Sequence, residues 1–108
     1  MDGRTHTGSL DAAQLGAELG ERATLVQFST AFCQPCRATR RVLAQVAGMV
    51  DGVTHVEVDA EAHLTLVRDL EIDRTPTVLV LDAAGRIVRR AVGQPRTADV
   101  VAALGRAM

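Results

Sequence analysis

The sequence contains no Lys, Asn, Trp or Tyr, and it has only two Phe and two Cys among its 108 residues. All twelve basic residues are therefore Arg, and against 13 acidic residues they leave a formal net charge of -1. With no clear excess of either sign, the charge gives no electrostatic reason to expect binding to nucleic acid or to an anionic membrane. We expect neither partner.

Long apolar runs are also missing. A membrane-spanning helix needs about 18 consecutive apolar residues, and no run in the sequence approaches that length. The polar start, Met1 to Ser9, also lacks the ~7–15 apolar residues of a secretory signal peptide. Two cysteines are too few for a secreted disulfide scaffold. We therefore expect a cytoplasmic protein. The size of the chain predicts a single domain, which we place over 10–108. The polar residues 1–9 before it are expected to be unstructured or to form a short edge strand.

The apolar residues change period along the chain. Helical spacing predicts helices over about 11–21, from Cys33 to about Val50, over about 61–71 and from Thr97 to the C-terminus. Strands are predicted over 24–29, 53–58, 77–81 and 86–92, with the last two joined as a hairpin by the turn 82–85. This order predicts an α/β domain whose central sheet is covered by helices on both faces.

Two of these helices carry start signals. Asp11 and Gln14 have the spacing of a capping box at the first helix. Thr97 is expected to cap the last helix. The apolar face of that last helix is predicted to be formed by Val100, Val101, Leu104 and Met108.

The two cysteines, in Cys33-Gln34-Pro35-Cys36, lie where a strand-like run ends and a helix begins. A thiol reacts as its thiolate, and the unpaired N–H groups and positive dipole of a helix start stabilise that anion. Pro35 is tolerated in a first helical turn. The pair therefore predicts thiol–disulfide exchange, in which Cys33 attacks a substrate disulfide and Cys36 resolves the mixed disulfide. No bound cofactor is expected, because the thiols carry the electrons.

The pair has two other interpretations. A zinc site needs further thiolates or suitably spaced histidines. The sequence has no third Cys, and His6, His55 and His63 have no recognised ligand spacing, so no metal is expected. Two inert buried thiols are the other alternative, which the helix-opening position and Pro35 disfavour.

Five features follow one another along the chain: Leu25 to Phe28, Cys33-Gln34-Pro35-Cys36, Val58-Asp59, Thr75-Pro76-Thr77 and Gly93. Joined in this order, they resemble the thioredoxin family over about 10–104. The resemblance implies the thioredoxin fold, with a mixed central sheet of four or five strands. It also implies that Pro76 is cis and faces the sulfurs, and that Gly93 lies in the substrate groove. The alternatives are a trans Pro76 that starts a strand and a Gly93 that is an ordinary turn glycine. The substrate-binding residues it implies are Phe32, Gln34, Pro35, Thr75, Pro76 and Gly93.

The chain departs from the family pattern at several positions. Typical members have a buried Asp where this chain has Gln27, which cannot titrate. Their paired lysine corresponds to His55, which we hypothesise takes over part of the proton handling; the favoured alternative is that His55 is only a half-exposed strand residue. Their two active-site tryptophans correspond to Ser29 and Phe32.

The resemblance implies a function in addition to the fold. It is that of a monomeric protein-disulfide reductase that acts on disulfide-containing client proteins and is recharged by a flavin-dependent thioredoxin reductase. Gln27 and Ser29 leave open a thioredoxin-fold binding or folding-assistance module with slow or no redox turnover. A redox-responsive partner of a single client, using the same two thiols, is a third alternative.

Overall fold

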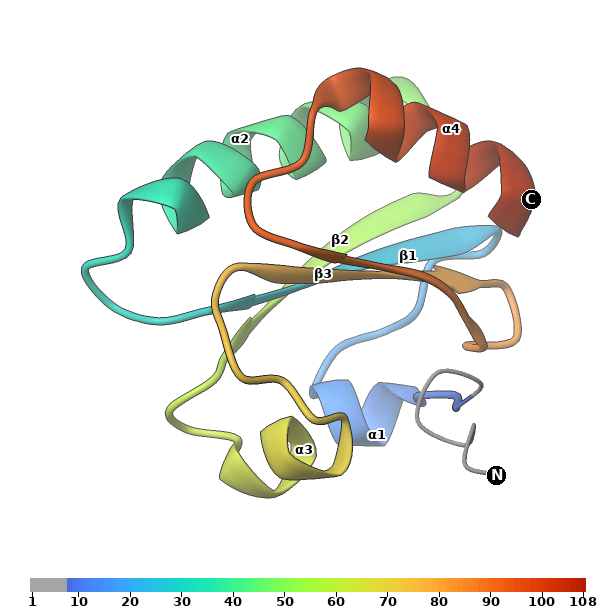
Figure 1. Ribbon diagram of the computed structural model, residues 1–108. Coiled ribbons are helices and arrows are strands. Elements are labelled where there is room, and N and C mark those ends of the chain that lie inside the picture. Colours follow the sequence, from blue (N-terminus) through green and yellow to red (C-terminus); the bar gives the residue numbers. More distant parts are fainter. Residues whose placement is uncertain (1–7) are drawn as a thin grey trace.

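A four-stranded mixed sheet forms the centre of the molecule in the computed structural model, which describes residues 8–108 (Figure 1). The strand order is β2-β1-β3-β4. β2 (Val53–Asp59) runs parallel to the central strand β1 (Ala23–Ser29). β3 (Thr77–Asp82) is antiparallel to β1, and β4 (Ile87–Val92) is antiparallel to β3.

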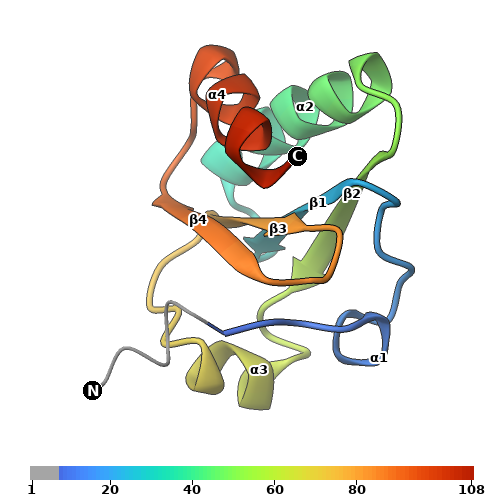
Figure 2. The same ribbon diagram turned by 90° about the vertical axis from the view of Figure 1, so that its right-hand side faces the viewer.

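Helices cover both faces of this sheet. α2 (Gln34–Met49) and α4 (Thr97–Ala107) lie on one face, and α1 (Ala12–Leu15) and α3 (Leu64–Asp69) lie on the other, as Figures 1 and 2 show. This arrangement confirms the predicted α/β class and the mixed sheet. The hairpin of β3 and β4 is also as predicted.

The core consists of two apolar clusters, one on each side of the sheet. β1 is buried at all of its positions because helices cover both of its faces. Val26 and Phe28 belong to the cluster on the side of α1 and α3, whereas Leu25 packs with Leu43 of α2 and Leu104 of α4. This packing fixes the direction of β1, whose C-terminal end leads through three residues to Cys33.

The first helix is shorter than predicted. Its capping box is present, with Asp11 Oδ1 accepting from the Gln14 backbone N–H at 2.8 Å and Gln14 Oε1 accepting from the Asp11 N–H at 2.9 Å. The helix ends after about one turn because Gly16 adopts φ +69°, a left-handed conformation that glycine accepts readily. Extension to residue 21 was therefore wrong; Leu19, whose spacing from Leu15 suggested it, packs on the same core from a loop.

The last two helices also differ from their predictions. α3 begins at Leu64 because Asp59 Oδ1 accepts from the Glu61 N–H at 2.9 Å and makes a turn there, and it ends before Glu71, which has φ +55°. In α4 the cap residue is Arg96, without a side-chain cap bond, so the capping role of Thr97 was wrong. The packed face of α4 consists of Val100, Ala103 and Leu104. Val101 and Met108, predicted on that face, are exposed.

Residues 8–10 run beside the edge strand β4. Ser9 forms an isolated antiparallel bridge with Arg86, flanked by bonds from Leu10 N–H to the Gly85 carbonyl at 2.9 Å and from Ile87 N–H to the Gly8 carbonyl at 3.0 Å. The rest of the predicted N-terminal segment, residues 1–7, lies outside the described residues. Across residues 8–108, no helix has both the length and the apolar content needed to cross a membrane.

Candidate active site

A disulfide joins Cys33 and Cys36 at the start of α2, with their Cα atoms 5.2 Å apart. Cys33 is the N-cap residue of the helix, and its Sγ accepts from the Cys36 backbone N–H at 3.2 Å. The two sulfur-bearing residues differ in exposure: Cys33 is half-buried, and Cys36 is only 1% exposed. An incoming reactant therefore reaches Cys33 first.

The start of α2 presents a positive electrostatic environment to Cys33. The first turn of the helix contains no acidic residue, so nothing there opposes the helix dipole and the free N–H groups that favour an anion at this end. Pro35 occupies this first turn, as predicted, and its carbonyl also accepts from the Thr39 hydroxyl at 2.7 Å. When the disulfide is reduced, this environment lowers the cost of a Cys33 thiolate.

The surface around Cys33 is open. Phe32 has φ +61° and a side chain that is 99% exposed. A non-glycine residue rarely adopts this left-handed conformation, and here it turns the ring away from the core beside the reactive sulfur. Gln34 and Pro35, between the cysteines, are exposed as well. These three positions are available to a partner.

The predicted residues from the second half of the chain lie together beside this surface. The Thr75–Pro76 peptide bond is cis, as the resemblance implied, and the trans alternative is wrong. The Thr75 and Thr30 hydroxyl oxygens are 3.2 Å apart, which links the Thr75 loop to the segment before Cys33. Gly93 N–H donates to the Pro76 carbonyl at 2.8 Å, and Gly93 has φ +89°. The fold thus brings both loops to the same end of the sheet.

Gln27 lies on β1 and contacts the backbone of Cys36. Its side chain is 0% exposed, and its Nε2 donates to the Cys36 carbonyl at 2.8 Å and to Ser29 Oγ at 2.9 Å. Its Oε1 is 3.0 Å from His55 Nε2. All the hydrogen-bonding capacity of the Gln27 NH₂ group is used, so a buried amide without net charge occupies the place where the family has an acid.

His55 is half-buried on β2, next to Gln27. Burial lowers the pKa of its imidazole; the Glu57 carboxylate opposes this lowering, and the Arg40 guanidinium adds to it. The favoured description of His55 as a half-exposed strand residue fits this position. Its hypothesised part in proton handling stays a prediction.

A family model provides an independent comparison for this geometry. The thioredoxin model matches residues 9–106. The chain belongs to the thioredoxin family. The disulfide at the start of α2 and the cis-proline loop beside it are the features of the fold that agree with this membership.

The individual curated relatives match a shorter stretch of this chain than the family model does. Thioredoxin domain-containing protein 2 of Mus musculus is 37% identical over 60 residues, 56% of this chain and 12% of the relative. Thioredoxin H-type of Ricinus communis is 30% identical over 69 residues, 64% of this chain and 58% of the relative. The chain therefore spans less than two thirds of either relative. Reduced Schistosoma mansoni thioredoxin pre-protein superposes with a TM-score of 0.70 at 20% identity, covering 82% of each chain, a likeness that concerns the fold.

Sequence reasoning missed a polar cleft at the end of β1, next to the segment that leads to Cys33. The cleft, about 370 Å³, lies where β1 and β2 end and is lined by Ser29, Thr30, Ala31, Arg40, Glu57 and Asp59. Across it Arg40 pairs with both carboxylate oxygens of Glu57, at 2.7 and 2.8 Å, and this bond lowers the pKa of Glu57. The only sequence signal was Ser29, a small polar residue at a position where the family has tryptophan.

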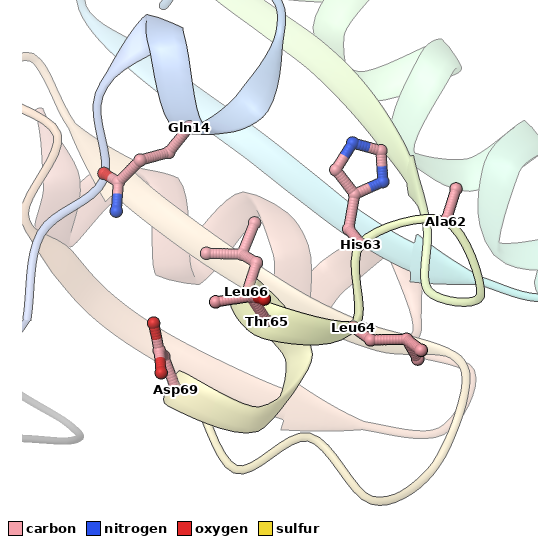
Figure 3. Close-up of a pocket in the computed structure, with 7 residues that line it drawn as sticks. All are labelled: Gln14, Ala62, His63, Leu64, Thr65, Leu66 and Asp69. Carbon is pink, nitrogen blue, oxygen red and sulfur yellow. The ribbon is translucent and has the colours of Figure 1, made fainter.

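A second groove lies on the other face of the sheet, between α1 and α3. It measures about 340 Å³, and Figure 3 shows Gln14 of α1 on one side and Leu66 and Asp69 of α3 on the other. The disulfide is not part of its lining. Within residues 8–108, no cluster of three or more His, Cys, Asp or Glu side chains is arranged to hold a metal ion.

Proposed function

We propose that this protein is a thiol–disulfide oxidoreductase that reduces disulfides in client proteins. The observation that carries the proposal is the disulfide at the start of α2, in which a half-buried Cys33 is joined to a buried Cys36. Membership of the thioredoxin family supports the same chemistry. The two cysteines are the only redox groups it requires.

The reaction proceeds in two exchanges. The reduced protein's Cys33 thiolate attacks one sulfur of the client disulfide; a Cys33–client bond forms and the other client sulfur leaves as a thiolate. Cys36 then loses its proton to solvent and attacks the Cys33 sulfur. The Cys33–Cys36 bond forms, and the second client sulfur leaves with the electron pair. Two electrons have passed to the client. The second step is fast because Cys36 is already within bonding reach.

The exposed residues around Cys33 form the client surface in this proposal. An extended client segment pairs with the Thr75 backbone, as in strand addition, while Phe32 packs against it and Gly93 leaves room. Gly93 has no side chain, and a Cβ at this position would contact no other atom of this chain. It would instead project into the space that a client would occupy. Gln34 and Pro35 complete this surface.

The proposal extends to the protein's partners and location. A flavin-dependent thioredoxin reductase regenerates the dithiol, and the protein acts as a monomer in the cytoplasm, where the glutathione pool keeps thiols reduced. These points rest on the family resemblance and on the small number of cysteines, two in the sequence.

Reduction of insulin disulfides by dithiothreitol, followed by turbidity, tests the activity. We expect the protein to accelerate the reaction and Cys33→Ser to abolish the acceleration. Cys36→Ser is expected to accumulate a mixed disulfide with its clients, because the resolving thiol is missing. Equal, slow rates for the wild type and Cys33→Ser would reject catalysis and favour a binding module.

A further inference from the structure

The hydrogen bonds around Gln27 have a fixed direction. The Cys36 carbonyl can only accept, so the NH₂ end of the Gln27 amide must face it, at 2.8 Å. The Gln27 Oε1 must then face His55. Because an amide oxygen also only accepts, His55 Nε2, 3.0 Å away, must carry a hydrogen and donate it.

This direction determines what His55 is able to do. Its Nε2 already carries a proton, and a neutral amide cannot pass one on, so His55 does not accept a proton from Cys36 through Gln27. Its remaining titratable atom is Nδ1. Protonation there makes His55 a cation at the outer end of a chain of two hydrogen bonds that ends on the backbone of Cys36.

We propose that His55 is a positioning residue for Cys36: it fixes the Gln27 amide against the Cys36 carbonyl, and its positive charge, when present, stabilises the Cys36 thiolate. The inference rests on the proposed function, since it concerns the step in which Cys36 closes the ring with Cys33. It assigns His55 an electrostatic role in place of that of a base.

The other charged groups that face His55 do not change their charge near neutral pH. Glu57, on the same strand, has a lowered pKa and is ionised. Arg40, from α2, remains a cation and is paired with Glu57. β1 contributes only the uncharged Gln27. A change in Cys36 reactivity between about pH 5 and about pH 8 is therefore expected to report the charge of His55.

The test compares wild type with His55→Gln, whose side-chain amide reaches to about the same place and donates to Gln27 but carries no charge. Reduced protein is mixed with dithiobis(nitrobenzoate) in a stopped-flow instrument. The first thionitrobenzoate released reports attack by Cys33. The second reports attack by Cys36 on the Cys33 sulfur, with thionitrobenzoate as the leaving thiolate.

We expect ring closure in the wild type to become about fivefold faster than in His55→Gln as the pH falls through the lowered pKa of His55, because an opposite charge close by favours the thiolate. The ratio should fall to about one near pH 8, where His55 is neutral. His55→Leu lacks the donor as well, and it should be slower than His55→Gln even near pH 8. His63→Gln, which removes an exposed histidine at the start of α3, should behave like wild type.

Several results would overturn the proposal. They are a wild-type to His55→Gln ratio that does not change with pH, a His55→Leu variant equal to His55→Gln near pH 8, or a His63→Gln variant with the same pH-dependent loss. Circular dichroism verifies that each variant is folded. The readout is separate from insulin reduction: a wild type that closes the ring but leaves insulin oxidised contradicts the proposed function and still tests His55.

Discussion

Replacement of Gln27 by Leu tests how strongly the buried amide holds the site together. Leu has a similar size but no hydrogen-bonding atoms, so the Cys36 carbonyl and the Ser29 hydroxyl, both bonded to Gln27, would lose a donor. The bonds lie in a fully buried environment, where Gln27 is 0% exposed. Each lost bond costs about 1 kcal/mol or somewhat more when its partner has no other donor. His55 is half-buried and can turn its N–H to water.

The leucine side chain offsets part of this cost through its apolar surface. We therefore expect Gln27→Leu to lower the free energy of unfolding by about 2 kcal/mol, which corresponds to a fall in Tm of about 10 °C for a domain of this size. Loss of about 2 kcal/mol is a substantial part of the ~5–15 kcal/mol that keeps such a domain folded. The ring-closing step should also slow, because Cys36 loses the bond that holds its carbonyl.

Urea denaturation of the oxidised protein measures this change. Because the sequence lacks Trp and Tyr, far-ultraviolet circular dichroism is the suitable probe. Gln45→Leu is the matched control: Gln45 is exposed on α2, and its replacement should change the stability by less than about 0.5 kcal/mol. A Gln27→Leu variant as stable as Gln45→Leu would show that the buried hydrogen bonds contribute little, and the reasoning would be wrong.

Two further predictions concern stability. Gly85→Ala should destabilise the fold by about 2 kcal/mol or more, since Gly85 has φ +87° and a Cβ would clash with the Leu10 carbonyl oxygen. Gly105→Ala, in an open position of α4, should instead stabilise the fold by about 0.5–1 kcal/mol in the same urea assay. The Arg40 bond lowers the pKa of Glu57 in the folded state, so its stabilising effect is present above the ordinary Glu pKa of 4.5 and is lost as the pH falls through the lowered value. The stability difference between wild type and Glu57→Gln should therefore shrink on acidification, and a constant difference would contradict this assignment.

The sequence by itself determined the class of fold and the pair of reactive residues. The continuous apolar run of β3 and the helical spacing of α2 are local patterns, because one strand or helix face buries residues close in sequence. The position of Cys33-Gln34-Pro35-Cys36 after a strand and at a helix start is local too, and the structure shows that disulfide there. The family resemblance added the cis-proline loop, which composition and periodicity do not reveal.

Helix ends and exposed faces could be predicted less well. The spacing of Leu15 and Leu19 suits a helix, but Gly16 ends it, and Leu19 reaches the core from a loop. Val101 is apolar like its neighbours, yet α4 rests on the sheet and α2 through Val100, Ala103 and Leu104. The choice between such faces depends on how the elements pack, which no short stretch of sequence specifies.

Only the tertiary structure decided which groups of the site bond to one another. Gln27, Cys36 and His55 lie on three different elements, β1, α2 and β2, and the direction of their hydrogen bonds follows from which atoms these elements bring together. The pairing of Arg40 with Glu57 and the cleft beside Ser29 arise in the same way. Sequence identifies the groups able to donate, accept or titrate. Their partners, burial and charge state depend on distances that exist only once the chain has folded.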